Sequence, residues 1–129
     1  MFATGIQHEL QARHYLLGDF GEESQPHSHP YRVELICRTP ELDSNGFSTD
    51  IDLLESSLAT TLEQIDNVLL NDLPYFHERQ PSLENLCRYI FDSVKKELDG
   101  SVREIEIKIW ESATAWASYT GRVDQGTQT

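Results

Sequence analysis

The chain is poor in basic residues, and this shortage excludes several kinds of partner. It has 10 lysines and arginines against 22 aspartates and glutamates, which gives a formal net charge of −12. Contacts to nucleic-acid phosphates and to anionic membrane surfaces depend on clustered lysine and arginine side chains. We therefore expect neither a nucleic acid nor a membrane as a partner.

Cysteines and long apolar runs are also scarce. Cys37 and Cys87 are the only cysteines and form no CxxC pair. No segment approaches the roughly 20 apolar residues that a membrane helix needs, and residues 1–16 lack the apolar run of a secretory signal. These absences predict a soluble, cytoplasmic protein with two buried thiols.

Two segments near the start alternate between apolar and polar residues, which is the period of a β-strand. They are residues 2–17 and residues 27–38, and in each the apolar side also carries two histidines. Tyr31 belongs to the apolar side of the second segment. Glycine, acidic residues and a proline fill the stretch between the segments, which predicts a loop.

The middle of the chain changes to helical period. Apolar residues recur at spacings of three and four over residues 52–69 and again over residues 82–98. Ser82 is expected to cap the start of the second helix. Alternation returns at residues 105–109 and 115–119, which predicts two further strands.

The expected order of elements is therefore β-β-α-α-β-β. Two amphipathic helices must cover the apolar face of an antiparallel four-stranded sheet, which is an α+β domain with both helices on one face. We expect one domain over residues 2–121 and a disordered polar tail over residues 122–129. The other face of the sheet is long and polar, so we expect a partner subunit to cover it or extend it at an edge.

Histidines on the two neighbouring strands predict a zinc site. Side chains two residues apart on a strand point the same way about 7 Å apart, so His27 and His29 can converge on one ion. His8 and His14 share one parity on the preceding strand, and alternation alone leaves both as candidates for the third ligand. Three neutral imidazoles suit Zn²⁺ and leave a fourth position for water or substrate. The alternative is a polar strand start without a metal.

Five motifs in the same order resemble the 6-pyruvoyl tetrahydropterin synthase and 6-carboxytetrahydropterin synthase family. They are ARHYL followed by HSHPYRVEL, then GFSTDIDLLE, IDNVLLND, PSLENLCRYI and IKIWESATAWASYTG. Together they cover residues 2–121 almost completely. The resemblance implies that His14, rather than His8, is the third zinc ligand. It also implies the tunnelling fold, or T-fold, in which trimers close their sheets into a barrel and two trimers stack.

The same resemblance implies a function and a set of site residues. The family acts on dihydroneopterin triphosphate or related pterins, so it implies a zinc-dependent lyase that works as a homo-oligomer. Glu111 matches the family's pterin anchor, whose carboxylate accepts hydrogen bonds from the ring donors. Asp66 matches the aspartate of the family's catalytic relay. Ser82, Glu84 and Asn67 complete the expected substrate-binding set.

Two departures from the family's pattern change the expected chemistry. The family's catalytic cysteine lies in the loop before the H-x-H motif, where this chain has Glu22 and Glu23, and Glu23 occupies the nearest matching position. Asn67 stands where the relay has its histidine, and a neutral amide cannot take up or return a proton. Glu23, or Glu22, is then expected to be the general base, which resembles a branch of the family that cleaves the pterin side chain.

The departures leave two readings open. The first is an active lyase whose product is formed by elimination with phosphate loss, by carboxy-pterin formation or by side-chain cleavage. It would serve biopterin, queuosine or folate biosynthesis. The second is a non-catalytic pterin-binding homologue that has kept zinc but lost the proton relay.

Overall fold

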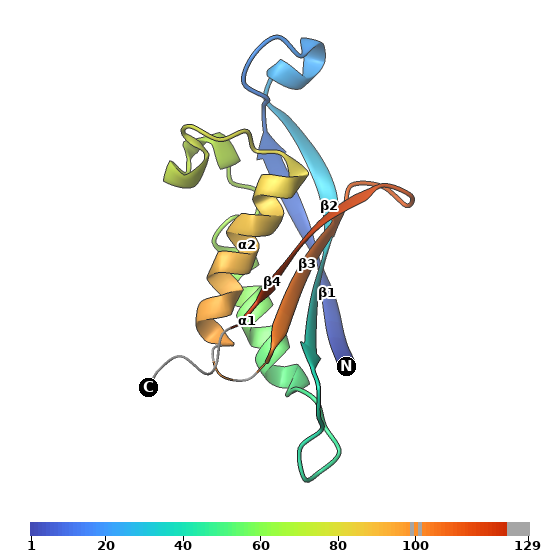
Figure 1. Cartoon of the computed structure of the whole chain (residues 1–129). Helices are drawn as coiled ribbons and strands as arrows, with labels where there is room; N and C mark the ends of the chain where they lie inside the picture. The colour runs from blue at the N-terminus through green and yellow to red at the C-terminus, as the bar shows by residue number, and fades with distance from the viewer. Residues whose placement is uncertain (99, 101, 124–129) are drawn as a thin grey trace.

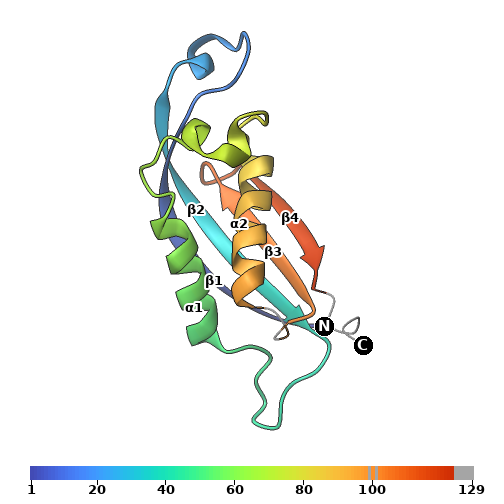
Figure 2. The same cartoon turned by 90° about the vertical axis from the view of Figure 1, so that its left-hand side faces the viewer.

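The computed structural model describes residues 1–98, 100 and 102–123. Its helices and strands are β1 (Phe2–His14), β2 (His27–Thr39), α1 (Ile51–Glu63), α2 (Leu83–Glu97), β3 (Glu104–Trp110) and β4 (Trp116–Arg122). The strands form one sheet in the order β1-β2-β3-β4, with every neighbouring pair antiparallel. Both helices lie side by side on one face of this sheet (Figures 1 and 2). The expected α+β architecture is confirmed.

The core lies between that face of the sheet and the helices. Alternation directs every second strand residue inward, and the fully buried strand residues include Val33, Leu35, Ile105, Ile107 and Ile109. The helices cover them with buried side chains that include Leu54, Leu58, Leu86, Ile90 and Val94. His14 shares this inward parity at the end of β1 and is only 6% exposed. The strand pattern therefore carries a histidine to the rim of the core.

Gly121 allows α2 to pack closely on β4. A Cβ atom at this position would overlap the ring of Phe91, with Cε2 only 2.8 Å away and Cζ closer still. Such contacts are too short for carbon atoms. Only a residue without a side chain therefore fits between this strand and this helix.

The first helix ends at Glu63, before the expected end at Leu69. Asn67 adopts the left-handed conformation with φ of 58°, which asparagine tolerates better than most residues. The turn brings the Asn67 N–H to 2.8 Å from the main-chain oxygen of Gln11 in β1. The chain therefore docks on the edge strand β1 here instead of continuing as a helix. Ile65, from the expected last turns of the helix, is still fully buried.

The described structure continues for two residues beyond the expected start of the C-terminal tail. Arg122 ends β4, and Val123 is 1% exposed, with its N–H donating to the main-chain oxygen of Arg103 at 2.8 Å. The rest of the expected tail, residues 124–129, lies outside the described residues. Within the described residues, no helix has the length and apolar character needed to cross a membrane.

Candidate metal centre

The register of β1 and β2 brings three histidines together. His14 is paired directly with His27, and His29 lies two residues further along β2 opposite Ala12. The His14 ring centroid is 4.5 Å from that of His27 and 5.6 Å from that of His29. His8, the other candidate of the same parity, lies elsewhere, because its Nε2 is 2.6 Å from Glu55 Oε2 of α1. The pairing therefore separates two histidines that alternation could not.

Glu23 joins the three histidines from a short 3-10 turn, Gly21–Ser24. One ligand atom from each of the four residues lies within 4.8 Å of all the others. Glu23 Oε2 lies 2.7 Å from His27 Nε2. Glu22, the other candidate base, is exposed and does not belong to this group. Of the two loop glutamates, the structure thus places Glu23 at the histidines.

The protonation of these side chains suits a cation. His27 Nδ1 is 2.7 Å from the main-chain oxygen of Gln25, which can only accept, so Nδ1 carries a proton and Nε2 is the nitrogen left to bind a metal ion. His27 Nε2 and His14 Nδ1 are buried, and neither has an aligned hydrogen-bond partner among the described residues. His27 Nε2 lies 2.7 Å from Glu23 Oε2, and a positive charge between the two atoms, carried by a proton or by a metal ion, stabilises this arrangement. Zn²⁺ fits this donor set.

Burial keeps His14 in the form that binds metals. The pKa of His14 is lowered from 6.5 to about 4, mainly by desolvation and also by the neighbouring His27 and His29, whereas the Glu23 carboxylate opposes this shift. The imidazole is therefore neutral at pH 7, and a neutral imidazole needs to lose no proton to coordinate an ion.

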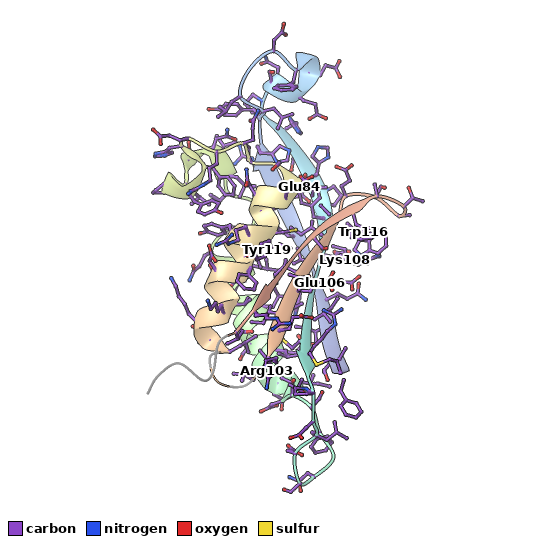
Figure 3. All side chains as sticks on the ribbon, viewed as in Figure 1. Glu84, Arg103, Glu106, Lys108, Trp116 and Tyr119 are labelled. Carbon is purple, nitrogen blue, oxygen red and sulfur yellow. The ribbon has the colours of Figure 1, made fainter. Side chains whose placement is uncertain are left out.

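A cavity of about 260 Å³ opens beside the histidines. The candidates from the sequence that line it are His14, His29, Glu23, Ser82, Glu84 and Glu111. Ser82 caps α2 by accepting the Asn85 N–H at 3.1 Å, and Glu84 follows in the first turn of that helix. The start of α2 lies at the end of the sheet from which the β1–β2 loop extends (Figure 3). The fold thus brings segments far apart in sequence into one pocket.

Tyr31 is a pocket residue that sequence reasoning assigned only to the apolar side of β2. Its ring stacks on His29, with centroids 5.7 Å apart and planes inclined by 11°, and it lines the cavity. Burial raises the pKa of the Tyr31 phenol, and the carboxylates of Glu111 and Glu23 raise it further. Its parity with His27 and His29 was the signal that could have found it.

Two side-chain amides hold the loop that follows β1. Asn71 accepts the N–H of Tyr15 at 2.9 Å and donates to the oxygen of the same residue at 3.0 Å. Gln80 does the same at Leu17, with distances of 2.7 and 2.8 Å. Each amide therefore replaces the paired hydrogen bonds that a neighbouring strand would make.

Leu16, which lies between Tyr15 and Leu17, contacts the 3-10 turn that carries Glu23. The N–H of Leu16 donates to the main-chain oxygen of Glu23 at 2.7 Å. The amides of Asn71 and Gln80 thus fix, through one further hydrogen bond, the backbone that presents the Glu23 carboxylate. Gln80 was missed because a loop residue has no periodic pattern around it.

Asp66 and Asn67 do not line the histidine pocket of their own chain. The Asp66 carboxylate accepts the N–H of Gln11 at 2.9 Å, next to the Asn67 contact with the same residue. Asp66 instead lines a separate cavity of about 340 Å³, together with His8. Within one chain, these two candidates therefore dock a loop on the outer edge of β1.

Comparison with known protein sequences identifies the family. Residues 5–122 match the family described as 6-pyruvoyl tetrahydropterin synthase. The chain is 31% identical over 97 residues to the 6-pyruvoyl tetrahydrobiopterin synthase of Drosophila melanogaster. The matched region covers 74% of this chain but only 58% of that protein's length. It is 24% identical over 117 residues to the 6-carboxy-5,6,7,8-tetrahydropterin synthase of Aquifex aeolicus, covering 72% of each.

Solved structures share the fold at lower identity. The 6-pyruvoyl tetrahydropterin synthase of Caenorhabditis elegans superposes with a TM-score of 0.81 at 22% identity, over 93% of this chain and 95% of that one. A Plasmodium vivax 6-pyruvoyltetrahydropterin synthase, with a catalytic glutamate changed to cysteine, gives 0.74 at 16% identity over 95% and 100%. These likenesses confirm the T-fold of the subunit. Since the sequence match extends over nearly all of the described residues, the chain belongs to the 6-pyruvoyl tetrahydropterin synthase family.

Proposed function

We propose that this protein is a zinc-dependent lyase that processes a dihydropterin, with dihydroneopterin triphosphate or a close relative as substrate. The observation that carries the proposal is the group of His14, His27, His29 and Glu23, whose ligand atoms lie within 4.8 Å of one another beside the pocket. The three histidines would hold the ion. Bound zinc supplies a Lewis acid for the side-chain hydroxyl oxygens of the substrate, which acidifies the adjacent C–H bond.

Glu23 is the proposed general base. It stands where the family resemblance places a cysteine, and a carboxylate can take up a proton as a thiolate does. The turn that carries it is fixed by the Leu16 hydrogen bond, which keeps the carboxylate beside the histidines. The Plasmodium vivax relative also has a catalytic glutamate. Glu23 would therefore take up the proton from the carbon atom that bears a side-chain hydroxyl group of the substrate.

Glu111 is the proposed pterin anchor. It follows the last residue of β3, and its N–H donates to the Ala115 oxygen at 3.0 Å, which closes the turn before β4. Its carboxylate is exposed at the pocket and can accept two hydrogen bonds from the ring N–H and the amino group. Ser82 and Glu84 provide further polar groups in the same pocket.

We also propose a homo-oligomer, a trimer or hexamer, in the cytoplasm. Asp66 and Asn67 lie outside the histidine pocket of their own chain. This placement supports the assembly, because in an oligomer they would lie at the pocket of a neighbouring subunit. The exposed Trp116 on the open face of the sheet, 49% accessible, supports a covering subunit. Cys37 and Cys87 are both free and buried, which fits a reducing compartment.

One observation favours a second candidate, a pterin-binding protein without turnover. Asn67 replaces the relay histidine, and the Asp66 carboxylate is already engaged by a main-chain N–H. A proton relay of the family's kind is then missing. This candidate keeps the zinc ion and the Glu111 anchor.

Mass analysis of products separates the two candidates. Zinc-loaded protein is incubated with dihydroneopterin triphosphate and with dihydroneopterin, and a lyase should form a new pterin product. Glu23→Gln should abolish that product, whereas Glu22→Gln, a matched change on the exposed neighbour, should retain it. Pterin binding without any product would support the second candidate, and equal activity in both variants would refute the role of Glu23.

A further inference from the structure

Gln80 joins two segments that line the histidine pocket. Leu16 and Glu23 come from the loop between β1 and β2, and residues 81–84 come from the start of α2. Gln80 directly precedes the second of these segments in the chain, while its side chain is hydrogen-bonded to Leu17 in the first. One residue therefore connects two parts of the pocket that are far apart in sequence.

The Gln80 side chain holds Leu17 through both of its polar atoms. Gln80 Oε1 accepts the N–H of Leu17 at 2.7 Å, and Nε2 donates to the main-chain oxygen of the same residue at 2.8 Å. Because glutamine carries an acceptor and a donor side by side, this pair fixes both the position and the orientation of the Leu17 main chain. The neighbouring N–H of Leu16 then donates to the main-chain oxygen of Glu23 at 2.7 Å.

The main chain of Gln80 is held in turn by α2. Asn85, in the first turns of this helix, donates from Nδ2 to the main-chain oxygen of Gln80 at 2.9 Å. The N–H of Asn85 also donates to Ser82 Oγ at 3.1 Å, which caps the helix. Buried side chains such as Leu86 pack the same helix on the sheet. A continuous series of contacts therefore runs from the core, through Gln80, to the turn that carries Glu23.

We propose, on the basis of the proposed function, that Gln80 is a positioning residue for the reaction, whose amide holds the loop so that the Glu23 carboxylate stays beside the histidines. A general base must lie within hydrogen-bond reach of the proton that it takes up, and a displacement of about 1 Å can cost about a hundredfold in rate. The 3-10 turn that carries Glu23 has no buried residue. Its position therefore depends on hydrogen bonds rather than on packing.

Gln80 should affect turnover more than binding. The three histidines of the metal centre are placed by the strand register of β1 and β2, not by the loop between the strands. Glu111 is placed by the turn before β4, where its N–H donates to the Ala115 oxygen at 3.0 Å. A substitution of the Gln80 side chain leaves both arrangements intact. We therefore expect kcat to fall while KM and the zinc content stay nearly constant.

Steady-state kinetics of the zinc-loaded full chain test this role. The substrates are dihydroneopterin triphosphate and dihydroneopterin. Gln80→Ala should lower kcat at least about tenfold and change KM by less than about threefold. Gln80→Glu keeps the shape of the side chain, but a carboxylate can only accept, so one of its oxygens would face the main-chain oxygen of Leu17 and repel it. The kcat of this variant should also fall, whereas a role in filling space alone would leave it unchanged.

Two further variants separate positioning from stability. Asn85→Asp removes the donor that holds the Gln80 main chain, but it adds a negative charge at the start of α2, which the helix dipole favours. The kcat should therefore fall severalfold without a loss of thermal stability. Thr39→Val removes a hydrogen bond to the Glu41 oxygen, 3.0 Å long, at the end of β2 away from the histidines. This control should lower the melting temperature and leave kcat unchanged.

The outcomes distinguish this inference from the function on which it rests. A wild-type kcat in Gln80→Glu, or an equal loss of kcat in Thr39→Val and Gln80→Ala, would overturn the role of Gln80 and leave a pterin lyase intact. If the wild type forms no product from either pterin, the proposed function itself fails. Hydrogen exchange of amides 15–17 would then still decide whether Gln80 holds the loop, and unchanged exchange in Gln80→Ala would overturn the inference as well.

Discussion

Acid should destabilise the metal-free protein through one buried histidine. His14 is 6% exposed and faces His27 and His29 at the end of β1. Its pKa is lowered from 6.5 to about 4, first by burial and then by these two neighbours. The unfolded chain exposes the same imidazole to water, where its pKa returns to the ordinary value.

The size of the effect follows from the difference between the two pKa values. Above pH 6.5 His14 is neutral in both states, so it adds no pH dependence to the free energy of unfolding. Between pH 6.5 and about 4 the unfolded chain binds a proton that the folded chain does not, so stability falls as the pH falls. The loss is about 2 kcal/mol at pH 5 and about 3 kcal/mol at pH 4, after which it levels off.

Urea denaturation of the chelator-treated protein at pH 7, 6 and 5 measures this loss. A His14→Asn variant should lack this part of the acid dependence, although it is less stable overall if the amide remains unpaired. His8→Asn changes a histidine outside the cluster, so this variant should still lose the free energy of unfolding that His14 accounts for between pH 7 and 5. If the wild type and the His14→Asn variant lose the same free energy between pH 7 and 5, the argument from burial is wrong.

Three other expectations follow from the packing and the site. His29→Ala should weaken zinc binding more than about tenfold in equilibrium dialysis, whereas His8→Ala should not, and equal zinc contents would refute the ligand assignment. Gly121→Ala should cost about 1–3 kcal/mol in urea denaturation because of overpacking, and a second change, Phe91→Leu, should restore part of it; no loss would contradict the close contact. Gln80→Ala removes two hydrogen bonds of about 1 kcal/mol each, so amides 15–17 should exchange hydrogen faster by mass spectrometry, and unchanged exchange would show that the loop is held otherwise.

Much of the fold could be predicted from sequence because its signals are local. Strand alternation repeats every two residues and helical spacing every 3.6, so each segment shows its buried side without knowledge of its neighbours. This placed His14, His27, His29 and Tyr31 on the inward side before any tertiary contact was known. The order of strands and helices then left one plausible layer arrangement, with both helices on the apolar face.

The candidate site depended on contacts that no local pattern contains. His8 and His14 have the same parity, and only the strand register pairs His14 with His27 while placing His8 opposite Val33. Glu22 and Glu23 are adjacent in a loop without periodicity, and only the folded turn directs Glu23 to the histidines.

The sequence by itself determined which sides of the strands and helices are buried and, through the family motifs, which chemistry to expect. Tertiary structure decided where α1 ends, since docking of Asn67 on Gln11 competes with another helical turn. It also decided which amides hold the loop after β1 and which carboxylates meet in the histidine pocket. These features depend on distances between segments far apart in the chain, which are set by packing and strand register rather than by the periodicity of any one segment.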